Sequence, residues 1–220
     1  MMAATGALLV QCTAAPPPAA APPVALSPAN VPSAPADAAV TAVTAAELGA
    51  SWRPGCPVGP GQLRRVAVNH IGFDGQTHRG ELVVHEDLVP QVRTVFEQLY
   101  RLRYPIEKIR TTDHYPGAAD ELSMEDNNTS AFSCRAIRGT GRWSKHAYGR
   151  AIDLNPLLNP SITAGGALEP RTAAAYLDRG RTDPGLLHDA DPAVRVFTDR
   201  GWRWGGHWQS PVDYQHFEWP

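Results

Sequence analysis

The chain of 220 residues has little of several features that mark common functional classes. Its formal net charge is only −2, so it lacks the basic excess of nucleic-acid-binding proteins and we expect no nucleic-acid partner. It contains no run of about 18 apolar residues, which excludes a typical transmembrane helix. With three cysteines and no CxxC or Cys/His cluster, it also lacks the pattern of a structural zinc finger.

Charged and aromatic residues are nearly missing from the N-terminal part. Residues 1–46 contain no Lys or Arg and a single acid, Asp37, and all six Trp lie at or after Trp52. Residues 13–40 instead hold eleven Ala and eight Pro in 28 positions. Such a segment has too little apolar surface to offset its ordering entropy. We therefore predict a disordered Ala/Pro-rich linker over 13–48 and one folded domain over 49–220.

The first twelve residues favour an export signal that is incomplete. A short apolar run, Ala7 to Val10, is followed by Cys12, but a basic segment and a longer apolar core are missing. Leu9 to Cys12 resembles a bacterial lipoprotein cleavage box, although Gln11 stands where a small residue is expected. Residues 1–12 are thus predicted as a truncated export or lipoprotein signal with Cys12 as the lipidation site, and a plain disordered N-terminus is the alternative.

The other two cysteines, Cys56 and Cys134, form an even pair. A disulfide between them would suit an oxidising compartment. Two unrelated buried thiols fit the spacing equally well.

Hydrophobic periodicity after residue 49 predicts mixed secondary structure. Apolar residues recur at helical spacing from Leu88 to Leu99, with Pro90 suited to the first turn. Asp191 and Pro192 are typical of a helix start, and Gly201 of its end. We also expect strands at 63–73, 81–85 and 106–112, a loop at 113–130, a short helix at 171–178, and strands around a loop in 202–219. Without regular βαβ alternation, the pattern favours a small single α+β domain.

The segment Ser144-Lys-His-Ala-Tyr-Gly-Arg-Ala-Ile-Asp153 carries the clearest chemical signal. His146 and Asp153 are seven positions apart, which would put them on opposite faces of a straight strand. Gly149 could bend the chain so that both face one point. His216 adds a second imidazole, and two His with one carboxylate form a catalytic zinc set that leaves a fourth position open.

An acid beside these ligands could serve as a general base. Asp213 lies three residues before His216 and could take a proton from the attacking water. Glu218 is the competing acid, but it would share a strand face with His216 and suits a hydrogen-bonding partner of that ring. The remaining histidines fit no ligand pattern and are predicted to be structural or surface residues, namely His70, His78, His85, His114 and His188.

These motifs resemble a known family. The segment after Ser144 matches Ser-x-His-x-x-Gly-x-Ala-x-Asp, and Asp213 to His216 matches the accompanying Glu/Asp-x-x-His. Together they resemble the VanY-like D-alanyl-D-alanine carboxypeptidase family of zinc peptidases, which includes L-alanyl-D-glutamate endopeptidases of phage endolysins. The likeness extends through 128–135 and 204–208 and covers roughly 52–220. It implies the small α+β fold shared with the hedgehog signalling domain.

The resemblance also implies roles for individual residues. His146, Asp153 and His216 would bind Zn²⁺, Asp213 would be the general base and acid, and Ser144 would support the metal-site loop. The arginine at position 135 falls where the family places a substrate-binding arginine, which could hold a carboxylate or the developing oxyanion. Alternatively, Arg135 pairs with an acid of the 119–126 segment.

Two positions depart from the family pattern. His207 replaces an Asp of many endopeptidase relatives in the Trp-Gly-Gly-x-Trp segment, and it could add a pH-dependent contact near the cleft. Asp213 stands where the carboxypeptidase branch more often has Glu, which favours the endolysin-like branch. Neither departure decides which bond is cut.

The sequence therefore predicts a zinc metallopeptidase that acts on peptidoglycan stem peptides. We expect it to be exported to the cell envelope or the extracellular space, with a possible lipid anchor, and to act as a monomer. The alternative is a non-catalytic zinc-binding module of the same fold that binds the wall or a partner protein.

Overall fold

The computed structural model describes residues 1–2 and 39–220. The predicted lipidation site Cys12, the rest of the predicted signal beyond Met2, and the predicted linker up to residue 38 lie outside these residues. Within the part of the chain that is described, no helix is long and apolar enough to cross a membrane.

An antiparallel three-stranded sheet forms one side of the domain, in the order β1-β2-β3. Its strands are β1 (Val40–Ala42), β2 (Leu63–Ile71) and β3 (Thr77–His85). The Asp74-Gly75 turn joins β2 to β3 as predicted, and β3 begins four residues before the predicted start at Glu81. Alternate apolar residues such as Val68 and Leu82 are buried against the main core.

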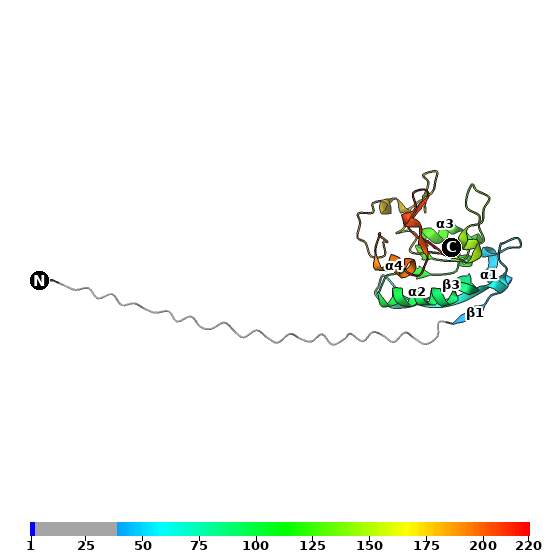
Figure 1. The fold of residues 1–220 in the computed structure, drawn as a ribbon, viewed down its shortest axis with the longest axis horizontal. Helices are drawn as coiled ribbons and strands as arrows, with labels where there is room; N and C mark the ends of the chain where they lie inside the picture. Colours follow the sequence, from blue (N-terminus) through cyan, green and yellow to red (C-terminus); the bar gives the residue numbers. More distant parts are fainter. Residues whose placement is uncertain (3–38) are drawn as a thin grey trace. The chain divides into compact units, whose positions relative to one another are not determined.

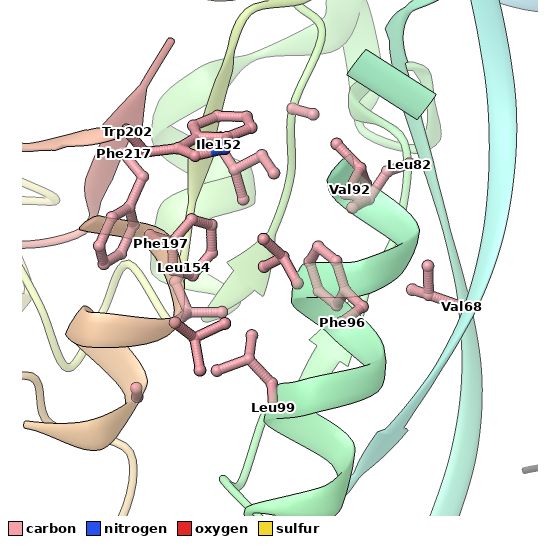
Figure 2. Packing of buried hydrophobic residues seen from close by; sticks show 14 of the residues in the cluster. Val68, Leu82, Val92, Phe96, Leu99, Ile152, Leu154, Phe197, Trp202 and Phe217 are labelled. Carbon is pink, nitrogen blue, oxygen red and sulfur yellow. The ribbon is translucent and has the colours of Figure 1, made fainter. Parts of the chain in front are cut away.

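Helix α2 (Val89–Arg101) packs against this sheet and confirms the predicted helix. Figure 1 shows it beside β3. Val92, Phe96 and Leu99 face the interior, as their helical spacing predicts. In Figure 2 these side chains lie between Val68 of β2 on one side and Leu154 and Phe197 on the other. The helix thus occupies the middle of the main core.

Two further small sheets come from the C-terminal half. One has the order β6-β11-β9, from β6 (Ala151–Asp153), β11 (His216–Glu218) and β9 (Arg203–Trp204). The other has the order β10-β7-β8, from β10 (Val212–Asp213), β7 (Ser161–Ile162) and β8 (Leu168–Glu169). Helix α4 (Pro192–Thr198) starts after Asp191 as predicted and ends before the predicted stop at Gly201. Its Phe197 stacks on Phe217 of β11 with ring centroids 3.9 Å apart.

The predicted strand at 106–112 and the predicted loop at 113–130 are largely wrong. The strand shrinks to β4 (Lys108–Ile109), which pairs in parallel with β5 (Asn128–Thr129), and the loop contains α3 (Asp120–Glu125). The buried Asn128 explains part of this, because its side chain accepts from Arg110 N–H and donates to Arg110 C=O. When a polar side chain replaces strand pairing in this way, the sequence shows no alternation of apolar residues from which the element could be predicted. The predicted helix at 171–178 is a 3₁₀ helix over Ala173–Leu177.

The predicted linker boundary at residue 48 is also wrong, because folded structure begins earlier. Strand β1 pairs with β2, and α1 (Ala45–Leu48) is capped by Thr44, whose side chain accepts from Glu47 N–H. Val43 and Leu48 are buried in a second, smaller core. This small core consists of Val43, Leu48, Val58, Leu63, Val83, Phe132 and Cys134, with Trp52, Cys56, Trp143 and Tyr148 packed against it. The amino-acid composition does not reveal this folded segment, because strand pairing at a sheet edge uses backbone N–H and C=O groups rather than charged or aromatic side chains.

The structure joins Cys56 and Cys134 in a disulfide, with their Cα atoms 5.8 Å apart. This resolves the choice between a disulfide and two free thiols that the spacing left open. Together, the helices and small sheets confirm a single α+β domain over the folded residues. The hedgehog-type topology stays a prediction.

Candidate metal centre

His146 and Asp153 reach the same point because the chain turns sharply between them. His146 lies in a 3₁₀ helix over Lys145–Tyr148, and Asp153 ends β6. Ser144 caps this helix, since its Oγ accepts from His146 N–H at 3.3 Å. Gly149 ends it in the left-handed conformation with φ of 65°. A Cβ at Gly149 would lie 2.6 Å from the backbone nitrogen of His85, so a glycine is required for both reasons.

The third member of the group, His216, comes from the neighbouring strand. In the antiparallel register of β11 and β6, His216 lies directly opposite Asp153. Its Nδ1 is 3.0 Å from Asp153 Oδ1 and 3.1 Å from His146 Nε2, and His146 Nε2 is 3.1 Å from Asp153 Oδ2. All three residues are buried, with 2%, 4% and 7% exposure for His146, Asp153 and His216.

The group of His146, Asp153 and His216 could hold a metal ion and is called the metal group below. Atoms that share one tetrahedral zinc ion through bonds of ~2.0–2.1 Å lie roughly 3.3 Å apart, close to the separations observed. Two imidazole nitrogens and a carboxylate are also donors that zinc prefers. The residues present therefore fit the predicted ion in donor type and in spacing.

The far nitrogens of the two rings are held by acceptors. His146 Nδ1 donates to the carbonyl oxygen of Ala131 at 2.5 Å, and His216 Nε2 donates to Glu218 Oε2 at 3.3 Å. Because a carbonyl and a carboxylate only accept, these contacts leave His146 Nε2 and His216 Nδ1 facing the shared point. Glu218 thus contacts the ring of His216, as their shared strand face predicted, and the Ala131 carbonyl has no signal in the sequence.

Burial and hydrogen bonding set the charges of the group. Burial alone would disfavour a charged Asp153, but the interactions with His146 and His216 hold the pKa of its carboxyl well below the usual range. Burial likewise opposes a charged His216, yet its hydrogen bonds to Asp153 and Glu218 prevail and raise the pKa of this imidazole to about 10. The metal-free group therefore holds a proton on His216 at neutral pH.

Asp213 lies beside the group on β10. Its strand partner is Ser161 of β7, whose hydroxyl hydrogen-bonds the carboxylate. Among the described residues, its Oδ1 is buried without a hydrogen-bond partner. Burial raises the pKa of Asp213 to about 7, and Asp153 adds to the increase, while the charges of His216 and Arg135 oppose it. A carboxylate with a free oxygen and a pKa near neutrality is suited to accept and return a proton.

Arg135 pairs with an acid of the 119–126 segment, as the alternative interpretation predicted, and its substrate-binding role stays a prediction. Its Nε lies 3.0 Å from Asp120 Oδ2, an acid of the 119–126 segment. One terminal guanidinium nitrogen also lies 3.8 Å from Asp153 Oδ2, at the edge of the metal group. The ion pair with Asp120 therefore orients a fixed positive charge toward the site, an arrangement that sequence reasoning foresaw only as an alternative.

His207 lies at the surface rather than among the ligands. Its Nε2 is 2.8 Å from Asp189 Oδ1, and its ring packs edge-on against Trp204. A pH-dependent contact of His207 near the cleft stays a prediction. The ring of Trp208 instead lies near the metal group, with its centroid 5.4 Å from that of His216. The histidines predicted to be structural are not members of the group.

Comparison with protein families agrees with these motifs. Residues 138–219 match the model of a D-alanyl-D-alanine carboxypeptidase family, and this range includes His146, Asp153, Asp213 and His216. Arg135 lies just before the matched range, so its assignment rests on the geometry above. No curated protein and no solved structure gave a significant match. The match covers 82 of the 220 residues, contains both motifs and supports the resemblance to the VanY-like D-alanyl-D-alanine carboxypeptidase family of peptidases.

Proposed function

We propose that the protein is a zinc metallopeptidase that hydrolyses peptide bonds of peptidoglycan stem peptides. The observation that carries the proposal is the buried His146–Asp153–His216 group with the unpaired oxygen of Asp213 beside it. A structural zinc site is usually closed by four protein ligands, whereas three ligands and an adjacent acid are typical of hydrolytic sites. The family match supplies the peptidase class.

Each residue has a distinct task in this proposal. Zinc, when bound by the three ligands, would polarise the scissile carbonyl and lower the pKa of the attacking water. Asp213 takes the proton of that water and returns it to the leaving amine. Arg135 holds a substrate carboxylate or the negative charge that develops on the carbonyl oxygen. Glu218 and the Ala131 carbonyl keep both imidazoles in the orientation that binding requires.

The proposed place of action is the cell envelope or the extracellular space. The Cys56–Cys134 disulfide supports this, because disulfides persist mainly in oxidising compartments. Peptidoglycan also lies outside the cytoplasmic membrane. A lipid anchor at Cys12, joined to the domain by the Ala/Pro-rich segment, would let the enzyme reach the wall from the membrane.

Purified protein incubated with defined stem peptides tests the proposal. The wild type should release fragments that mass analysis identifies, and chelation should abolish the release. Asp213→Asn should lower kcat by roughly 10²–10⁴-fold, the usual contribution of a general base, without lowering the zinc content. Asp183→Asn, which alters a half-buried acid that pairs with Arg181, is the matched control and should keep full activity.

The outcomes separate the alternatives. Full activity in a metal-free preparation would refute the mechanism. Tight zinc binding without cleavage of any stem peptide would favour the non-catalytic wall- or partner-binding module. The product masses also distinguish a carboxypeptidase, which releases a terminal D-alanine, from an endopeptidase that cuts after L-alanine.

A further inference from the structure

Arg53, in the segment between the first helix and the disulfide, reaches across to the part of the chain that carries Arg135. One of its terminal nitrogens donates to the carbonyl oxygen of Cys134 at 2.7 Å. Its guanidinium carbon also lies over the ring of Trp143, 5.8 Å from the centroid. A charged donor to a carbonyl is stronger than a neutral one, and a cation above an indole ring adds to it.

These two contacts fall at the start of two functional segments. Cys134 immediately precedes Arg135, and Trp143 immediately precedes Ser144, which caps the helix of His146. The segments run side by side, since Ser144 N–H donates to the carbonyl oxygen of Arg135 at 3.1 Å. One guanidinium therefore ties together the backbone that carries the arginine of the site and the backbone that leads to a metal ligand.

Other contacts also hold the backbone at Cys134. Cys134 N–H donates to the Ser51 carbonyl at 2.9 Å, and the disulfide holds Cys134 from the side-chain direction. Beyond Arg135, residues 137–142 form an exposed turn in which Gly139 and Gly141 have positive φ. Because this turn is exposed, the backbone of Arg135 is held by the contacts of Cys134 before the turn and by the hydrogen bond from Ser144 after it.

We propose that Arg53 is a positioning residue that acts through Arg135. Among the residues that the structure describes, its side chain bonds the Cys134 carbonyl and lies over Trp143, and it thereby fixes the backbone from which the Arg135 guanidinium projects. This inference rests on the proposed function of Arg135. Because displacement of a catalytic group by about 1 Å can cost on the order of 10²-fold in rate, loss of Arg53 should lower kcat/KM by about tenfold or more.

Variants at this position test the proposal. Arg53→Met keeps the length of the side chain and removes both the hydrogen bond and the charge above Trp143. Arg53→Lys keeps a positive charge and a hydrogen-bond donor, so it should be more active than Arg53→Met. Arg200→Met is the matched control, because Arg200 also donates a part-buried 2.7 Å bond to a backbone carbonyl, that of Val196, away from the site.

A double-mutant cycle distinguishes positioning from a general effect on the fold. If Arg53 acts through Arg135, Arg53→Met should reduce kcat/KM in the wild-type background and have little further effect on Arg135→Met. An equal loss in both backgrounds would overturn the proposal, as would unchanged kcat/KM in Arg53→Met. Melting temperatures measured alongside ensure that the rates refer to folded protein.

Amide hydrogen exchange provides a readout independent of peptidase activity. The amides of Cys134 and Ser144 should exchange faster in Arg53→Met than in the wild type or in Arg200→Met, because both hydrogen bonds lie on the restrained segments. Unchanged exchange would refute the positioning role even if activity fell. Faster exchange in a protein whose wild type cleaves no stem peptide would instead refute the proposed function and leave the positioning of Arg135 intact.

Discussion

In the metal-free protein, a proton occupies the place that a zinc ion would take. His216 Nδ1 points at Asp153, and the pKa of the imidazole is raised to about 10 by its hydrogen bonds to two carboxylates, against the effect of burial. Protonated His216 donates through both nitrogens, so the lone pair that a metal needs is blocked. Zinc must displace this proton before it can bind. The affinity for zinc should therefore rise with pH.

The size of the effect follows from the pKa. At pH 7 the imidazole is three units below a pKa of about 10, so only about one molecule in a thousand has His216 neutral. The apparent affinity is then about a thousandfold, or about 4 kcal/mol, below that of the deprotonated group. Each pH unit should change it about tenfold, which gives about thirtyfold between pH 6.5 and pH 8. The folded-state pKa is raised above the ordinary value of 6.5, so protonation of His216 stabilises the metal-free fold fully below about pH 6.5, and this contribution is lost as the pH rises to about 10.

Competition with a chelator of known pH dependence measures the affinity, and calorimetry in buffers of different ionisation enthalpy counts the protons released. The Asp213→Asn variant is the better protein for this assay, because Asp213 itself has a pKa of about 7 and would release protons near the ion. At least about one proton per zinc, the one displaced from His216, should leave this variant at pH 7. A flat affinity from pH 6.5 to pH 8 without proton release would show that His216 is neutral in the metal-free protein and refute the reasoning.

Three further changes have expected outcomes. Glu218→Gln replaces the carboxylate behind a metal ligand and should weaken zinc binding by roughly 10–100-fold, measured by chelator competition, with little change in melting temperature. Gly149→Ala should lower the free energy of unfolding by more than the ~1–2 kcal/mol that a left-handed non-glycine residue costs, because its Cβ would lie 2.6 Å from a backbone nitrogen. Gly141→Ala is the control, because Gly141 has φ of +67° and open space around it. Equal losses of unfolding free energy in chemical denaturation would exclude the clash. Replacing Cys56 and Cys134 by Ser should lower the unfolding free energy by about 4.5 kcal/mol, from loop entropy over their separation of 78 residues, and an unchanged denaturation midpoint would contradict this.

The parts of the fold that the sequence predicts are those with a repeating local pattern. Helix α2 follows from apolar residues at helical spacing, and the β2–β3 hairpin from alternation around Asp74-Gly75. The metal group is predictable for a different reason, because His146, Asp153 and His216 belong to two short motifs whose spacing matches a family. Gly149 then explains how an odd separation brings the first two together.

Tertiary contacts determine the remaining parts, which have no local pattern. Strand β1 exists because β2 offers an open edge, and α3 lies in a polar stretch whose order depends on the side chain of Asn128. One partner of the site residues is equally hidden. The Ala131 carbonyl contacts His146 from elsewhere in the chain, and no spacing rule connects them. The partners of His216 and Arg135 were easier to foresee, because Glu218 shares a strand face with His216 and the 119–126 segment is rich in acids.

If the group binds a metal ion as proposed, binding requires the correct register between β11 and β6. His216 faces Asp153 across two antiparallel strands, and Phe217 between the polar residues of β11 turns the other way to stack on Phe197. A slip of one residue would exchange these faces, bury His216 among aromatic rings and turn Phe217 toward the ligands. A misaligned molecule could still be compact and helical, yet it would hold no ion. The zinc content of a refolded sample would therefore count the correctly registered molecules more directly than its helical signal.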